Sequence, residues 1–159
     1  MTRTHIAALL AFAVAVPAAI AGSFSASNDA PCLVAGKTGY RMSDNASANI
    51  TVRIDNAAAK PDLRVQLTDD AAAADFVLLD DGVAAGGACP GGTAIQSVRL
   101  DPTAANPDLT VALSRAPAAY KIYLRSAGFS QQDGAALFAA IWRNAGKITG
   151  SGREFAARN

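Results

Sequence analysis

The sequence predicts an α+β protein with a mainly antiparallel sheet, built from two duplicated three-stranded units, and one C-terminal helix. Three observations predict this class: an internal repeat, alternating apolar and polar residues within each copy, and one amphipathic segment near the C-terminus. An all-β sandwich with an added helix is the alternative. The 159 residues suffice for one domain.

We expect four segments along the chain. Residues 1–21 form a signal peptide, residues 22–31 a flexible N-terminus, residues 32–149 a single domain, and residues 150–159 a loose tail. Within the domain, segment 52–82 recurs without a gap as segment 98–128. Of the 31 paired positions 14 are identical, and 10 of these are not alanine, so chance is a poor explanation.

Each copy reads as strand, loop, strand, short turn and strand. Apolar residues alternate with polar ones in segments 52–54 and 63–67, and Pro61 ends the loop between them. Segments 98–100, 109–113 and 120–125 repeat the pattern with Pro107, and segment 76–79 is the third strand of the first copy. The turns after the second strands are shorter than the dozen or so residues that a parallel crossover needs, which favours antiparallel neighbours.

Caps and turn residues mark the remaining elements. Thr68, Asp69 and Asp70 in the first copy and Ser114 in the second are expected to cap the alanine-rich turns that follow. A loop rich in glycine spans residues 82–93.

The one convincing helix spans Ser130–Ala145. Ser130 with Asp133 forms a capping box, and Gly146 is a plausible stop. An apolar face, expected to cover one side of the sheet, consists of Leu137, Phe138, Ile141, Trp142 and Ala145.

The N-terminus reads as a secretory signal. Arg3 and His5 precede an apolar run, and Ala19-Ile20-Ala21 predicts cleavage after Ala21, with Ala18 as the alternative. Pro17 interrupts the run, which argues against an uncleaved anchor. The sequence therefore predicts a periplasmic or secreted protein without a transmembrane segment after cleavage.

The mature chain holds two cysteines, Cys32 and Cys89, which we expect to form a structural disulfide in an oxidising compartment. In the chain-entropy description such a bridge stabilises the fold by roughly 3–4 kcal/mol. A metal site would need further ligands nearby, and the spacing is not that of a C-x-x-C redox pair.

Histidine chemistry is excluded from the mature chain because His5 is the only histidine. Catalytic triads that need a histidine, histidine-ligated zinc and the usual general base near neutral pH are therefore absent. A hydrolase that depends on Asp or on a Ser/Lys pair is a weaker alternative. No catalytic residue, metal site or cofactor is predicted.

An acidic cluster in the first copy raises the alternative of a Ca²⁺-stabilised envelope protein. Its spacing is not that of an EF-hand, and capping and turn roles explain it better. The cluster consists of Asp69, Asp70, Asp75, Asp80 and Asp81.

A basic face is the candidate binding site. Lys121, Tyr123 and Arg125 alternate with apolar residues on one strand, and Arg99 is expected to join them from a neighbouring strand. Such a face suits an anionic glycan, a lipid headgroup or an acidic envelope protein, while the alternative is an ordinary solvated surface. Loss of Arg3 leaves 13 Lys and Arg against 13 Asp and Glu, so nucleic acid is not expected.

Three segments together resemble small exported proteins of unknown function from Gram-negative bacteria. They are the alanine-rich signal, the unit at 52–67, and the ending at 120–125 with 137–143. This resemblance implies neither an activity nor site residues. We therefore expect a non-catalytic binding or interaction module with an unknown ligand.

Overall fold

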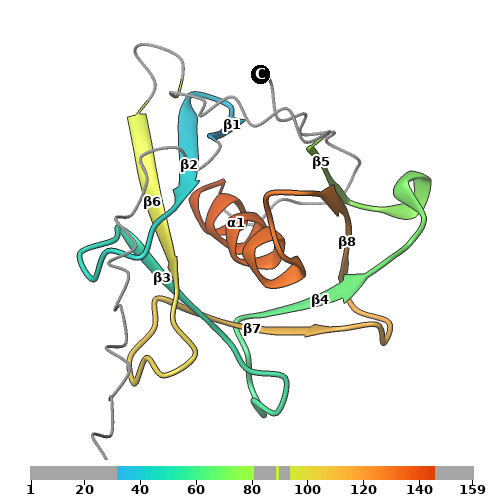
Figure 1. Cartoon of the computed structure of the whole chain (residues 1–159). Coiled ribbons are helices and arrows are strands. Elements are labelled where there is room, and N and C mark those ends of the chain that lie inside the picture. Colours follow the sequence, from blue (N-terminus) through green and yellow to red (C-terminus); the bar gives the residue numbers. More distant parts are fainter. Residues whose placement is uncertain (1–31, 81–88, 90–93, 146–159) are drawn as a thin grey trace, which may run out of the picture.

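The computed structural model of this chain describes residues 32–80, 89 and 94–145. They form an α+β fold, with eight strands in one mixed sheet and one C-terminal α-helix (Figure 1). The predicted class is confirmed, and the sandwich alternative is wrong because the described strands share one sheet. The expected signal peptide, flexible N-terminus, loose tail and, apart from Cys89, the glycine-rich loop lie outside the described residues.

The sheet has the order β1-β2-β6-β3-β7-β4-β8-β5. A short 3₁₀ helix, η1, spans Ala71–Ala73 and the α-helix α1 spans Gln131–Asn144. The strands are β1 Leu33–Ala35, β2 Thr38–Met42, β3 Ile50–Ile54, β4 Leu63–Leu67, β5 Phe76–Asp80, β6 Ala94–Leu100, β7 Leu109–Ser114 and β8 Tyr120–Ser126.

The strands of the two sequence copies are interleaved. The first copy supplies β3, β4 and β5 and the second supplies β6, β7 and β8, and the two sets alternate across the sheet. Every neighbour of β3, for example, comes from the second copy. The expected pairing within two three-stranded units is therefore wrong, and the duplication itself stays a prediction from the sequence.

The expectation of an antiparallel sheet is also wrong, because every pairing except that of β1 with β2 is parallel. The reason is a stagger between successive strands. Val111 of β7 pairs with Ile54, the last residue of β3, and with Leu63, the first residue of β4. The loop 55–62 therefore only crosses β7, about 10 Å of lateral movement, and does not run back along a strand.

Equivalent central residues, which we call pivot residues, recur through the sheet. Val98, Val52 and Ile122 each pair with the last residue of one strand and the first residue of the next, and Val65 does so within one residue. Together with Val111 they make five pivot residues, and each is at most 1% exposed. The core thus runs through the points where successive strands meet.

Four of the eight strands, β3, β4, β5 and β7, begin with a hydrogen-bonding device that we call the Asx latch. The side chain of the residue before the strand accepts a backbone N–H from the preceding strand in the sheet order. Asp62 accepts from Thr110 at 2.7 Å, and its own N–H donates to the Thr110 carbonyl at 2.8 Å. The side chains of Asp75, Asp108 and Asn49 accept in the same way from Lys121, Thr51 and Ser97.

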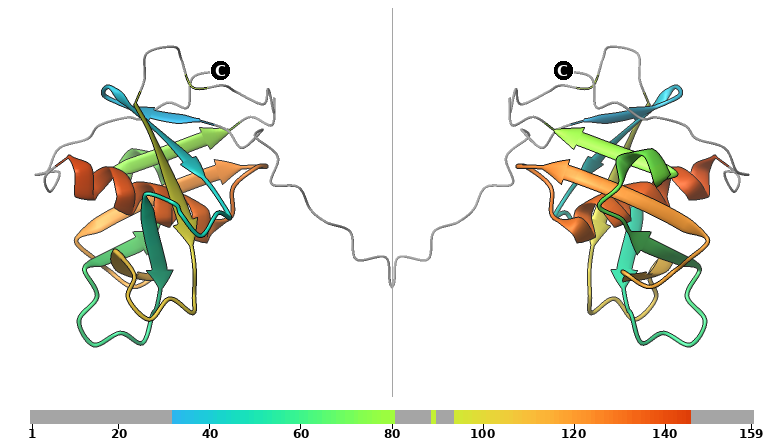
Figure 2. Two further views of the ribbon diagram at one scale, coloured as in Figure 1. Left: turned by 90° about the vertical axis from the view of Figure 1, so that its left-hand side faces the viewer. Right: turned by 90° about the vertical axis from the view of Figure 1, so that its right-hand side faces the viewer.

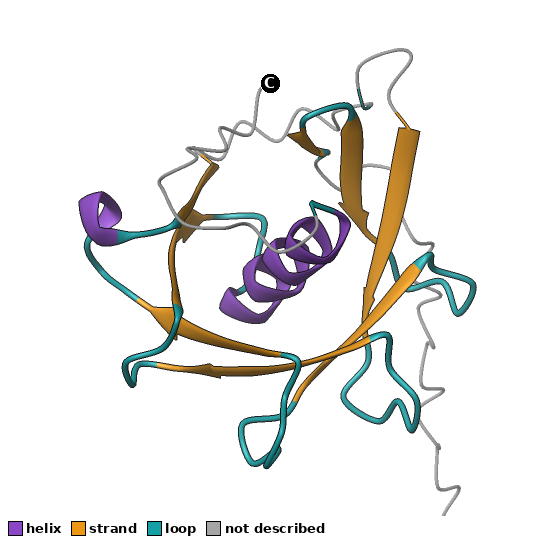
Figure 3. Cartoon of the chain, turned by 180° about the vertical axis from the view of Figure 1, so that it is seen from behind, coloured by secondary structure: helices purple, strands orange, loops and turns teal. Residues whose placement is uncertain are grey.

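The helix α1 lies inside the curve of the sheet (Figures 1 and 3). Its eight consecutive residues Gly134–Ile141 are all buried, and it contacts β2, β3, β6, β7 and β8. The helix covers one side of the sheet, the inner one, as expected, but its buried surface is wider than the single apolar face that the sequence predicts. A helix that is apolar all round is an enclosed helix, and the alanines keep it narrow enough for the space.

Both ends of α1 are fixed by polar contacts. The predicted capping box of Ser130 and Asp133 is confirmed. Near the C-terminus, the Trp142 indole N–H donates to the Tyr120 hydroxyl at 3.1 Å, and the Asn144 amide donates to the Tyr40 hydroxyl at 3.1 Å. These bonds connect the helix to strands on two sides of the sheet.

The capping predictions for the turns hold only in the first copy. Asp70 caps η1 by accepting the N–H of Ala72 at 2.9 Å. In the second copy Ser114 accepts the N–H of Ala116, but no helix follows within residues 115–119. The shorter connection to β8 leaves no room for it.

The N-terminal hairpin of β1 and β2 was not predicted from the sequence. Its tight turn contains Gly36 at φ 63°, which is a left-handed conformation that favours glycine. The predicted disulfide is confirmed: Cys32, just before β1, is bonded to Cys89 with the Cα atoms 5.3 Å apart. The bridge ties this hairpin to the segment ahead of β6.

Enlarging a residue of the enclosed helix tests this packing. We expect Ala139→Leu to destabilise the fold by roughly 1–3 kcal/mol, because an overpacked core must shift its neighbours. Leucine and alanine have similar helix propensities, so the helix itself is unaffected. Gln132→Leu, at an exposed position of α1, is the control, and chemical denaturation measures both. Equal stability of the two variants would contradict an enclosed helix.

The strand β8 offers a test of the Asx latch, because Ala119 precedes it where Asp or Asn precedes β3, β4, β5 and β7. We expect Ala119→Asp to raise the free energy of unfolding by roughly 0.5–1.5 kcal/mol, the usual net worth of a hydrogen bond. Ala119→Leu has a similar size but no acceptor and should give no gain. A thermal melt in which Ala119→Asp is no more stable than Ala119→Leu argues against the latch.

Candidate functional site

The charged side chains at the described outward positions of the strands, on the sheet face that points away from α1, are all basic. Along each strand, buried residues alternate with residues that face outward. Among the described outward positions of β2–β8, none is acidic. Six are basic, namely Arg41, Arg53, Arg64, Arg99, Lys121 and Arg125.

The described aspartates lie instead at strand ends and in connections, where several bind the backbone. Asp62, Asp75 and Asp108 form Asx latches. Asp55 and Asp101 each accept the N–H two residues further along, which closes the turn after a strand.

These roles account for part of the acidic cluster of the first copy. Asp70 caps η1, Asp75 forms a latch, and Asp69 pairs with Arg115 at 2.7 Å. The side chain of Asp80 and residue Asp81 lie outside the described residues. Within residues 32–80, 89 and 94–145, no group of three or more His, Cys, Asp or Glu side chains is arranged to hold a metal ion.

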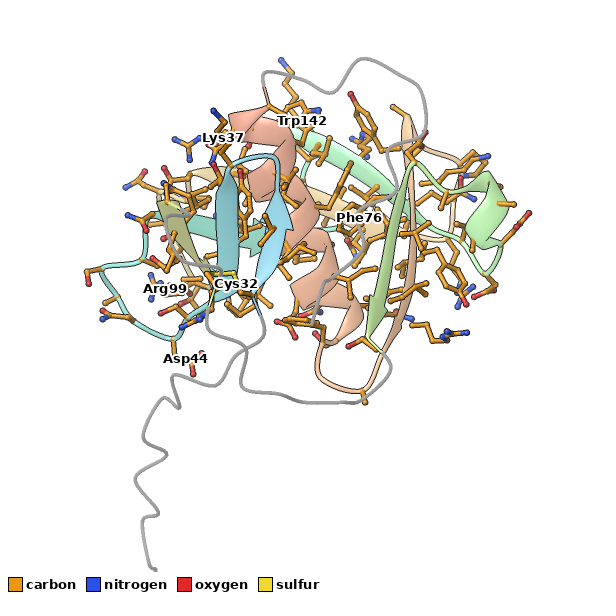
Figure 4. The ribbon with its side chains drawn as sticks, turned by 90° about the horizontal axis from the view of Figure 1, so that it is seen from above. Cys32, Lys37, Asp44, Phe76, Arg99 and Trp142 are labelled. Carbon is orange, nitrogen blue, oxygen red and sulfur yellow. A yellow bond between two sulfur atoms is a disulfide. The ribbon has the colours of Figure 1, made fainter. Side chains whose placement is uncertain are left out.

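Arg99 does not join the other three predicted site residues. It lies on β6, and β3, β7 and β4 separate β6 from β8. Figure 4 shows Arg99 beside β2 and β6, on the opposite side of the molecule from β8. Its guanidinium pairs with Asp101 at 2.8 Å.

Arg53, at the equivalent position of the first copy, also binds loops. Its Nη1 donates to the Ala104 carbonyl at 2.9 Å, and its Nη2 lies 4.0 Å from Asp55. The loops after β3 and β6 extend side by side at one end of the molecule (Figure 2). The arginine of the repeated Val-Arg-x-Asp unit therefore holds loops rather than a ligand.

Lys121, Tyr123 and Arg125 lie together on β8 as the alternation predicts. Gln66 of β4 pairs with Lys121, while Val77 and Leu79 of the edge strand β5 pair with Tyr123 and Arg125. Arg64 lies one diagonal step from Lys121 across the strand pair, a separation of about 7–8 Å. We call this surface the β8 face: Arg64, Gln66, Val77, Leu79, Lys121, Tyr123 and Arg125.

Sequence reasoning missed four members of the β8 face. Arg64, Gln66, Val77 and Leu79 belong to the first copy, whereas the predicted residues belong to the second. The repeat signal suggested that each copy pairs with itself, and nothing in the alternation alone shows interleaving. The outward register of Arg64 in segment 63–67 was the one available signal.

The shape of the β8 face limits its ligand. The sheet curves around α1, so its outer face is convex (Figure 1). Small-molecule sites are concave and bury most of the ligand surface. A convex surface with cations, a tyrosine and two aliphatic side chains suits contact with a macromolecule instead.

An ion pair between Asp108 and Arg143 connects the sheet to the helix α1. Asp108 accepts the Thr51 N–H at 2.9 Å with one carboxylate oxygen and binds Arg143 at 2.9 Å with the other. The Thr51 hydrogen bond and then the Arg143 guanidinium hold the pKa of Asp108 below its usual value, against the opposing effect of burial. This contact fixes the C-terminal end of α1 to the start of β7.

Comparisons of the chain with protein-family models, with curated proteins and with solved structures gave no match. Among the described residues, no helix combines the length and the apolar character needed to cross a membrane.

The pH dependence of stability tests the Asp108 contact. A carboxylate with a lowered pKa in the folded state stabilises the fold above its unfolded pKa, about 3.9 for Asp, and loses this contribution as pH falls through the folded value. We expect Asp108→Asn to be less stable than wild type at pH 7. The gap should close progressively below about pH 4.

Asp62→Asn is the matched control, because Asp62 makes the same backbone hydrogen bond and has no ion pair among the described residues. Urea denaturation at several pH values measures both variants. A gap between wild type and Asp108→Asn that stays constant from pH 7 to pH 2 would contradict this assignment.

Proposed function

We propose that the protein is a non-catalytic binding module of the periplasm or extracellular space, which binds an anionic macromolecule through the β8 face. The observation that carries this proposal is the sorting of charge: the charged side chains at described outward positions of the strands are all basic. Such a surface attracts and orients a negatively charged partner.

Within the outer face, the β8 face is the region best suited to binding. Arg53 and Arg99 hold loops and aspartates. Among the described residues no carboxylate forms an ion pair with the Lys121 ammonium group, and Tyr123 adds an aromatic surface beside it. An anionic glycan, an anionic lipid surface and an acidic envelope protein share the chemistry that this face recognises.

The proposed location outside the cytoplasm has separate support. The disulfide between Cys32 and Cys89 closes a separation of 57 residues, and structural disulfides persist in oxidising compartments. The N-terminal segment with signal-peptide character agrees with this location.

Charge reversal on the β8 face tests the function. We expect Lys121→Glu/Arg125→Glu to weaken binding of the mature, oxidised protein to an anionic probe by at least about tenfold at low salt, because steering and contact are both lost. The probes are poly-glutamate, dextran sulfate and vesicles containing anionic lipid. Binding isotherms at several salt concentrations distinguish which class of anion binds most tightly.

The control variant Lys37→Glu/Lys60→Glu makes the same change in net charge at two exposed turn positions. At about 0.15 M salt, where the Debye length is about 8 Å, it should bind within about threefold of wild type, because neither lysine belongs to the β8 face. Equal loss in the two double variants would show that only net charge matters. Failure of wild type to bind any of the probes would also count against the proposal.

A further inference from the structure

Backbone donors in this sheet follow one rule. Outward-facing residues donate their N–H toward the next strand in the sheet order: Thr51 of β3 donates to Asp108 ahead of β7, and Thr110 of β7 to Asp62 ahead of β4. Lys121 of β8 donates to Asp75 ahead of β5. In each of these strands the donor is the second residue.

The same rule applies to β5, the strand at one edge of the sheet. Strand β5 is the last in the order, and its second residue is Val77. By the same alternation, Val77 and Leu79 direct their N–H and carbonyl groups to the position beyond β5. Among the described residues, no strand occupies that position. An open sheet edge of this kind is a template for an added strand.

The sheet also shows what chemistry fits at such a position. Asp or Asn precedes β3, β4, β5 and β7, and alternating apolar residues follow, as in Asp108, Leu109, Val111 and Leu113 beside β3. The Asx side chain accepts the second-residue N–H, and the first apolar residue then pairs with the pivot residue. Beside β5 the corresponding residues are Val77 and Leu78.

We propose that the edge of β5 binds an extended segment of a partner protein in parallel orientation, with an Asp or Asn that accepts the Val77 N–H and alternating apolar residues after it. This inference goes beyond the proposed function, because backbone groups of β5 rather than cationic side chains hold the segment.

The probe is a labelled, end-capped peptide with the sequence of residues 106–114, which is itself a following strand in this fold. We expect it to bind the mature, oxidised protein in a fluorescence-polarisation titration. Val77→Pro should weaken binding by at least about tenfold, because it removes the donor that faces the open edge while leaving the ladder to β8. Proline is tolerated at such edge positions. Val77→Ala keeps the donor and should retain binding.

A second pair of probes leaves the protein unchanged, so that it stays decisive if Val77→Pro fails to fold. N-methylation of the peptide at Val111 removes the N–H on the side that faces β3 in this fold, whereas N-methylation at Thr110 removes the N–H on the opposite side. Only the first should abolish binding. The peptide with Asp108→Ala should also bind at least several-fold more weakly.

The β8-face variant separates this inference from the proposed function. Lys121→Glu/Arg125→Glu should bind this peptide within about threefold of wild type while losing poly-glutamate. Val77→Pro should show the reverse behaviour. Strand addition is overturned if the peptide does not bind the wild type, or if the Val77→Pro protein and the Val111-methylated peptide bind normally.

Discussion

The stagger between successive strands is the constraint on which the rest of this structure depends. Because β3, β4, β5, β7 and β8 each start about level with the end of the strand before them in the chain, a short loop that crosses a single strand can connect two parallel strands. The two connected strands are therefore not neighbours, because a strand of the other copy lies between them. The five pivot residues lie where three strands meet. The Asx latches stabilise four of these points by accepting backbone N–H groups at the starts of β3, β4, β5 and β7. The stagger thus explains the interleaving of the strands, the burial of the core and the placement of the aspartates.

The stagger also determines the chemistry of the surface. Aspartates are needed where strands begin and where loops turn, so acidic groups are held at the ends of the strands. Outward positions within the strands are free of that requirement, and there the chain carries arginine and lysine. A cationic outer surface results from a chain whose charges nearly balance.

Local features of the sequence predicted local structure well. The alternation at Leu63, Val65 and Leu67, the capping box at Ser130 and the pair of cysteines all appear as expected. Neighbour relations were wrong, since alternation defines which residues face inward but not which strand lies alongside. The loop-length rule for parallel strands assumes neighbours that start level, and the stagger removes that assumption. For the candidate site, three residues on one strand could be predicted, whereas Arg99 required knowledge of the strand order. The run Gly134–Ile141 does carry a signal for an enclosed helix, because it contains no polar side chain.

The interleaving of the two copies determines when each strand can pair as the chain is synthesised. Apart from the β1–β2 hairpin, the paired residues of the sheet are separated by 46 to 57 positions along the chain. A chain that emerges from its N-terminus therefore has no partner for β3, β4 or β5, and none for β2 besides β1, until the residues from Ala94 onward have followed. Folding dominated by such distant contacts is slow. The first half of this protein therefore cannot complete its sheet pairings before the second half has been made.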